Sequence, residues 1–153
     1  MDYISQVLPS LLSGSLVTLQ VFFIVLVLSI PLGAILAFLM QVPFKPLQWL
    51  LTVYVWIMRG TPLLLQLIFL YYVLPGVGIS FERMPAAIIA FTLNYAAYFA
   101  EIFRAGIQSI PKGQYEAARA LGFTYVQTMR RIIVPQMVKR VLPPVGNETI
   151  TLV

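Results

Sequence analysis

An all-α, polytopic bundle of membrane-spanning helices is the fold class that the sequence predicts, on three observations. Of the 153 residues, 60% are hydrophobic and 10% are charged, whereas a soluble domain carries about 25% charged residues. Three apolar stretches are each long enough to cross a hydrocarbon core about 30 Å thick. Basic residues gather in the segments that flank these stretches. The bilayer therefore takes the place of water as the solvent for most of the surface.

The composition excludes several kinds of chemistry. The chain has no cysteine and no histidine, so disulfides and thiolate-bound metals are excluded, and the commonest metal ligand and general base is missing. We expect no cofactor, no metal and no enzymatic activity. The net charge of +5 lies beside apolar spans, where it indicates orientation and contact with membrane lipid. We expect no nucleic-acid partner.

The first span is predicted over residues 11–40. As a straight helix it would extend about 45 Å, so it must tilt or bend, and Pro31 with Gly33 offers a place to bend. Gly33, Ala34 and Ala37 form a small-residue strip, which indicates either close helix contact or the ordinary composition of membrane helices. The chain has no basic residue between Met1 and the first apolar run, whereas a cleavable signal peptide begins with a positively charged region. We therefore expect this segment to be retained in the mature protein.

The second span is predicted over residues 49–74 and is interrupted by Arg59-Gly60-Thr61-Pro62. Thr61 could cap a new helix with Pro62 as its first residue. Two interpretations follow: a short interfacial helix followed by a span, or one tilted helix with a kink. Arg59 either contacts a polar group across helices or marks the end of the second helix, and we favour the second role.

The third span is predicted over residues 86–107. Asn94, Tyr98 and Glu101 occur at i, i+4 and i+7, so they share one helical face. An ionisable group at membrane depth is costly unless it is paired or faces a hydrated cavity. Glu101 therefore either faces such a cavity or pairs with Arg104 and extends towards water.

A polar segment over residues 108–140 follows, with two short helices predicted at 114–121 and 125–134. Gly122 can end the first in the left-handed conformation, Thr124 with Gln127 fits a capping box for the second, and Pro135 is expected to close it. Residues 141–153 begin a further apolar helix. Loops rich in Lys and Arg stay cytoplasmic, so this segment is expected inside and the N-terminus outside. With three spans, one side carries Lys45, Arg104, Lys112, Arg119, Arg130, Arg131, Lys139 and Arg140.

The most specific pattern is Glu116-Ala117-Ala118, three residues, Gly122, nine residues, Ile132, one residue, and Val134-Pro135. It resembles the EAA loop of permease subunits in bacterial ATP-binding-cassette importers. Only Val134 departs from that pattern, standing in place of Leu. Further segments resemble the branch that serves polar amino acids, namely Arg59 to Leu64, Leu93 to Tyr98, Ala100 to Arg104 and Ser109 to Gln114.

The resemblance implies a type I importer permease domain over 1–153, incomplete because family members continue through further spans. In that family the loop docks into a groove on a separate ATPase, which assigns coupling to Glu116, Ala117, Ala118, Gly122 and Pro135. The chain has no phosphate-binding Gly-x-x-x-x-Gly-Lys-Ser/Thr run, so a partner must hydrolyse ATP. Other implied partners are a second permease chain, an extracytoplasmic substrate-binding protein and a polar amino acid, at a bacterial inner membrane.

Three alternatives stay open at this point. The loop could instead be an amphipathic helix lying on anionic headgroups. The protein could be a transporter or channel that needs no ATPase, or a membrane scaffold fragment without a transport role. On the leading interpretation, Asn94, Tyr98 and Glu101 line the substrate path.

Overall fold

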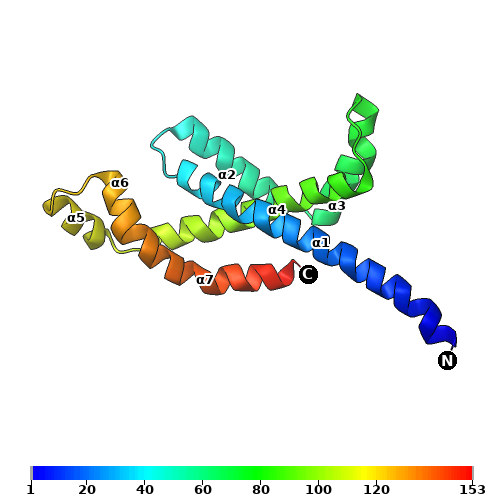
Figure 1. Cartoon of the computed structure of the whole chain (residues 1–153). Helices are drawn as coiled ribbons and strands as arrows, with labels where there is room; N and C mark the ends of the chain where they lie inside the picture. The colour runs from blue at the N-terminus through cyan, green and yellow to red at the C-terminus, as the bar shows by residue number, and fades with distance from the viewer. Residues whose placement is uncertain (1, 153) are drawn as a thin grey trace.

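The computed structural model describes residues 2–152, and every regular element within them is helical (Figure 1). Two short π-helical turns and one 3-10 turn interrupt the α-helices. The elements in chain order are α1 (Asp2–Leu39), α2 (Lys45–Gly60), α3 (Leu63–Ile68), the π turn η1 (Phe69–Val73), the 3-10 turn η2 (Leu74–Val77), α4 (Arg83–Gln108), α5 (Lys112–Ala120), α6 (Tyr125–Thr128), the π turn η3 (Met129–Ile133) and α7 (Val134–Thr151).

Helix α4 is the centre of the bundle, and α1, α2, α3 and α7 all pack against it. Figure 1 shows it passing between the other long helices. Many of its buried residues are small: Ala86, Ala90, Ala96, Ala97, Ala100 and Gly106. Without a hydrophobic force between helices in lipid, small residues let backbones approach and gain van der Waals contact. The composition of α4 therefore places it in the middle.

Helix α1 meets α4 along one stripe, formed at four-residue steps by Val25, Ser29, Gly33 and Ala37, all of which are buried. A Cβ added to Gly33 would lie 2.6 Å from the Phe99 Cβ and 3.0 Å from the Ala100 nitrogen. The small-residue strip thus marks a close helix contact. The helix begins at residue 2, nine residues earlier than predicted, and continues through Pro31 without a break.

The second apolar region breaks more sharply than either sequence interpretation allowed. Helix α2 begins at Lys45 and ends at Gly60, and the helical segment 63–77 leaves it at an angle of 105°. Thr61 was predicted to cap the helix that follows, but it is the C-cap of α2 instead. Pro62 holds the N-cap position of α3. The prediction was wrong because the Thr61 hydroxyl donates to the Ile57 carbonyl of the preceding turn, at 2.8 Å.

Polar side chains satisfy the carbonyls that this break leaves free. Gln66 Nε2 donates to the Met58 carbonyl at 3.0 Å, and Asn94 Nδ2 donates to the same carbonyl at 2.8 Å. The Asn94 amide also donates to Gln66 Oε1 at 3.1 Å. An unsatisfied backbone group in a bilayer costs several kcal/mol, so these two amides make the bend possible.

By length and composition, two helices can cross a membrane, Val7–Leu39 and Arg83–Gln108. The bent pair α2 with residues 63–77 adds a third if it counts as one span. The third predicted span, 86–107, lies inside α4. Three crossings would bring the end of α1, the start of α2, the end of α4 and α5 to the same end of the bundle, and Figure 1 shows them there.

Pro135 does not close the second short helix. The chain stays helical from Tyr125 through η3 into α7 and reaches Thr151, so the predicted boundary between 140 and 141 lies inside one helix. Proline lacks an N–H and its ring crowds the carbonyl of residue i−4. A π turn is wider and relieves that crowding. Both π turns end two residues before a proline, at Val73 before Pro75 and at Ile133 before Pro135.

Candidate functional site: a helical knob and a polar hollow

The first candidate site is the knob, which we define as α5, the following turn and α6, residues 112–128. Helix α5 ends at Ala120, and Gly122, which follows its C-cap Leu121, has a φ of +77°. The Gly122 N–H donates to the Arg119 carbonyl at 2.9 Å, and the Phe123 N–H donates to the Ala118 carbonyl at 3.0 Å. These two bonds form a Schellman motif, which requires a left-handed residue. The predicted left-handed conformation of Gly122 is confirmed.

A capping box begins the second helix of the knob, as predicted. Thr124 Oγ1 accepts from the Gln127 N–H at 3.3 Å, and the Thr124 N–H donates to Gln127 Oε1 at 2.9 Å. Two backbone donors that would otherwise be free are thus satisfied reciprocally. The turn between the helices is therefore held by hydrogen bonds among residues 118–127.

The knob presents an exposed face that combines charge, small size and apolar surface. Glu116, Ala117 and Gly122 are exposed, whereas Ala118 is fully buried and packs inside. Pro135 lies on α7, outside the knob. Three exposed apolar side chains on the knob were not predicted: Leu121 at 74%, Tyr125 at 63% and Val126 at 71% exposure. Their positions next to the end of α5 and at the start of α6 could have indicated that they are exposed.

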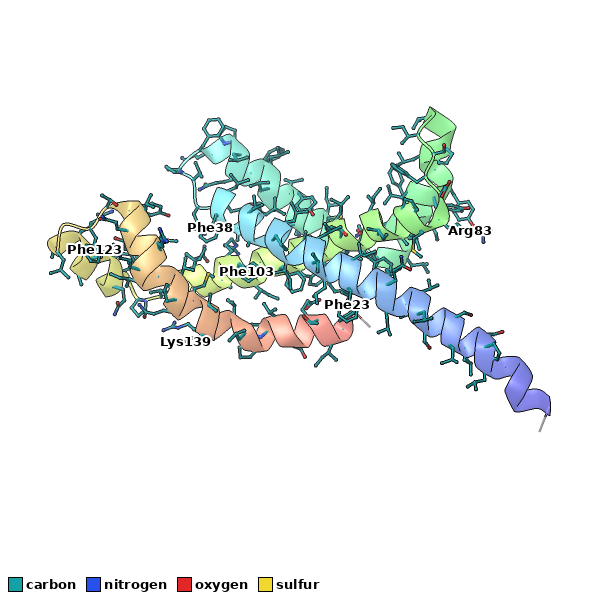
Figure 2. The ribbon with its side chains drawn as sticks, viewed as in Figure 1. Phe23, Phe38, Arg83, Phe103, Phe123 and Lys139 are labelled. Carbon is teal, nitrogen blue, oxygen red and sulfur yellow. The ribbon has the colours of Figure 1, made fainter. Side chains whose placement is uncertain are left out.

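Side-chain contacts fasten the knob to the long helices. Gln136 Nε2 of α7 donates to Gln114 Oε1 of α5 at 3.3 Å. Just before the knob, Arg140 of α7 donates to the carbonyl of Ser109 at the end of α4 and, at 3.1 Å, to its hydroxyl, so this contact joins α7 to α4. Tyr115 packs half-buried against the core; burial, and next the nearby Tyr125, raise the pKa of its phenol. Figure 2 shows the knob, marked by Phe123, at the far end of the bundle.

The second candidate site is the polar hollow, a pair of adjoining cavities of about 510 Å³ each between the α2–α3 break, α4 and α7. Both cavities are lined by Arg59, Tyr98 and Glu148. The Arg59 guanidinium carbon lies 5.1 Å from the centre of the Tyr98 ring, a cation–π geometry. A cation, a phenol and a carboxylate from three helices therefore face one space.

The three predicted residues of α4 do border the polar hollow, but two are engaged. Asn94 is buried and bonded at the α2–α3 break. Glu101 accepts from Arg104 Nε at 3.0 Å and pairs with the same guanidinium at a second oxygen. Of the described residues, only Glu101 and Arg104 form an ion pair. Arg59 lies at the end of α2, the position predicted for a boundary residue, but it borders the hollow as well.

Glu148 was missed because residues 141–153 were interpreted only as the start of another apolar helix. The structure places it on α7 facing the polar hollow. One carboxylate within a mostly apolar helical stretch was the indication that could have found it.

Comparison with known proteins places this architecture. Residues 29–153 match the family described as the binding-protein-dependent transport system inner membrane component. The probable glutamine ABC transporter permease protein GlnM of Bacillus subtilis strain 168 is 48% identical over 125 residues, which cover 82% of this chain and 58% of that protein. The L-cystine transport system permease protein TcyB of the same strain is 38% identical, over 99% of this chain and 65% of that one.

A solved structure agrees. The crystal structure of an amino acid ABC transporter with histidines contains a chain that superposes with a TM-score of 0.87 at 38% identity, covering 99% of this chain and 72% of that one. This chain thus spans about 58% to 65% of the length of the two curated relatives above. The predicted all-helical permease fold is confirmed, and the chain belongs to the family of binding-protein-dependent transport system inner membrane components.

Proposed function

We propose that this chain forms part of the translocation path of an ATP-driven importer of polar amino acids and couples that path to a separate ATPase. The observation that carries the proposal is the knob, a pair of short helices with an exposed face and a side-chain hydrogen bond from Gln136 of α7 to Gln114 of α5. Force applied to such a knob reaches the long helices, because its turn is fixed by a Schellman motif and a capping box. The relatives' names, which include glutamine and L-cystine permeases, support this substrate class.

For the coupling contact, Glu116, Ala117 and Gly122 on the exposed face meet the ATPase, while Ala118 supports them from inside. Leu121 and Tyr125 add exposed apolar area to the same region. Pro135 acts indirectly, through the π turn between the knob and α7. Hydrolysis of ATP belongs to the partner.

For the substrate path, the polar hollow is the best candidate. Tyr98 and Glu101 line it, with Asn94 at its rim. Arg59 and Glu148 add one positive and one negative group that face the same cavities. An amino acid carries an ammonium and a carboxylate, so a site with both charges can attract each end of it.

For orientation, the knob lies in the cytoplasm and the N-terminus outside. The end of the bundle that carries the knob also carries Lys45 and the basic residues of α5 and η3, and such segments stay cytoplasmic. The remaining partners are a second permease chain, an extracytoplasmic substrate-binding protein and membrane lipid.

Reconstitution with the ATPase and the binding protein tests the proposal. Uptake of a radiolabelled polar amino acid into vesicles should require ATP and stop with a hydrolysis-dead ATPase. Uptake that survives the dead ATPase but collapses with the proton gradient would identify an ATPase-independent transporter. A complete absence of flux for all amino acids, with ATPase bound, would identify a scaffold.

A further inference from the structure

An apolar groove of about 730 Å³ lies beside the knob and shares no lining residue with the polar hollow; of its lining residues, the proposed ATPase contact uses only Tyr125. One wall is the end of α1 and the connection to α2, with Phe38, Val42 and Pro43. The other wall is α6 and η3, with Tyr125, Val126 and Met129. Figure 2 labels Phe38 at the knob end of α1. We call this cavity the juxtamembrane groove.

The chemistry of the juxtamembrane groove combines an apolar interior with one cation. Arg130 is the one charged residue that lines it, and in the described part of the chain no hydrogen bond or ion pair is recorded for its guanidinium. Arg131 follows it directly, and Lys45 lies two residues beyond Pro43. Of the five acidic residues, only Glu116 lies on the knob. Arg130 is therefore the charge that faces the apolar lining.

The groove adjoins an exposed apolar surface at the end of α1. Ile35 is 56% exposed and Phe38 is 40% exposed, and both belong to the candidate span that ends at Leu39. The groove thus opens where the hydrocarbon core meets the headgroup layer. Basic pockets between helices on the cytoplasmic side of a membrane, where the proposed orientation places this groove, bind anionic headgroups. Each basic residue near the surface contributes about 1 kcal/mol.

We propose that the juxtamembrane groove holds an anionic phospholipid, with an acyl chain between α1 and α6 and the phosphate at Arg130. The apolar walls bury methylenes, which favours occupation by about 0.8 kcal/mol for each. The unpaired guanidinium selects a negative headgroup. This lipid wedges between the first span and the knob, so it steadies the angle at which the knob leaves the bundle.

Quenching of a fluorophore by brominated lipid tests this directly, since the chain has no native cysteine. The variant Gln41→Cys places a bimane label on the groove wall in the protein reconstituted in vesicles. Phosphatidylcholine vesicles receive increasing fractions of phosphatidylglycerol brominated on its acyl chains, and a parallel series receives brominated phosphatidylcholine. We expect half-maximal quenching at a fraction of phosphatidylglycerol about fivefold lower than that of phosphatidylcholine, the factor to which about 1 kcal/mol corresponds.

The matched pair of variants is Arg130→Gln and Arg131→Gln. Each removes one positive charge, but only Arg130 lines the groove. Arg130→Gln should abolish the preference for phosphatidylglycerol, and Arg131→Gln should retain most of it. Equal quenching by the two lipids in the unsubstituted groove would overturn the proposal. So would an absence of quenching by either lipid, which would mean that protein fills the groove, whether a further segment, a second copy or the ATPase. The readout does not depend on transport, so it can fail while the proposed function holds.

Discussion

The helix interface around α4 and the knob are stabilised in opposite ways. At the interface, glycine and alanine let helices touch, and Gly33 and Gly106 lie where any Cβ would collide with a neighbouring helix. On the knob, Gly122 has open space around it, yet its φ of +77° excludes most side chains. A glycine is required for packing in the first region and for backbone conformation in the second. Substitutions should therefore damage stability at the interface and coupling at the knob.

The largest effect is expected at Gly33. Its Cβ in Gly33→Ala would lie 2.6 Å from the Phe99 Cβ and 3.0 Å from the Ala96 carbonyl oxygen, and backbone cannot move aside easily. Overpacking of this kind costs about 1–3 kcal/mol. The control is Gly14→Ala in the same helix, where nothing lies within 4 Å and alanine should stabilise by up to about 1 kcal/mol. Unfolding in a detergent titration measures both. Equal midpoints for the two variants would contradict the packing account.

The second effect is expected at Gly122. Gly122→Val must adopt a left-handed backbone, which costs about 1–2 kcal/mol, so the turn of the knob distorts. We expect normal abundance in the membrane but binding to the ATPase weakened by a factor of about 5–30, measured by co-purification and titration. Gly113→Val is the matched control, because Gly113 is equally exposed and has an ordinary φ. A similar loss of ATPase binding in both variants would show that helix propensity, and not the Schellman turn, is responsible.

A smaller effect is expected at the capping box. Thr124→Ala removes the acceptor of the Gln127 N–H, and loss of an N-cap costs about 1 kcal/mol. Faster hydrogen exchange of the amides 125–128 should report it. Ser13→Ala, which removes a hydroxyl bonded within its own helix, should leave exchange in its helix nearly unchanged. Unaltered exchange over 125–128 in Thr124→Ala would show that packing holds α6 without the cap.

The smallest effect on stability is expected for Glu101 and Arg104. Their side chains are 27% and 31% exposed, so the pair should contribute at most about 1 kcal/mol. Glu101→Gln keeps the size and removes the charge. If Glu101 serves the polar hollow, uptake should shift from cationic towards neutral amino acids at normal abundance. The double variant with Arg104→Gln gives the coupling energy. Reduced abundance in the single variant that the double restores, with selectivity unaltered, would make the role purely structural.

Sequence reasoning succeeded where structure is local. Gly122 and the Thr124–Gln127 box act within five residues, so the pattern alone predicted their geometry. It failed where distant segments decide. The sharp bend after α2 was not predicted, because the Met58 carbonyl there takes hydrogen bonds from Gln66 and from Asn94, 28 residues further along. Pro135 failed as a terminator because a π turn absorbs it.

The same distinction applies to the candidate sites. The exposed face of the knob follows from the EAA pattern, although the burial of Ala118 does not, because that burial depends on how α5 meets the following helix. The polar hollow could not be predicted in full, since Arg59, Tyr98 and Glu148 come from three helices. Their meeting depends on the 105° bend, which the sequence left open.

One measurement tests the central claim most directly, namely whether the exposed face of the knob touches the ATPase inside the cell. Ala117→Cys places a single thiol on that face of the cysteine-free chain. In the assembled transporter in inverted membrane vesicles, we predict that a short bifunctional reagent links this thiol to the ATPase subunit. Gly14→Cys, in the N-terminal half of α1 and away from the knob, should give no such link. A thiol at position 117 that reacts with an impermeant reagent outside intact cells, and never links to the ATPase, would contradict the coupling role and the orientation together.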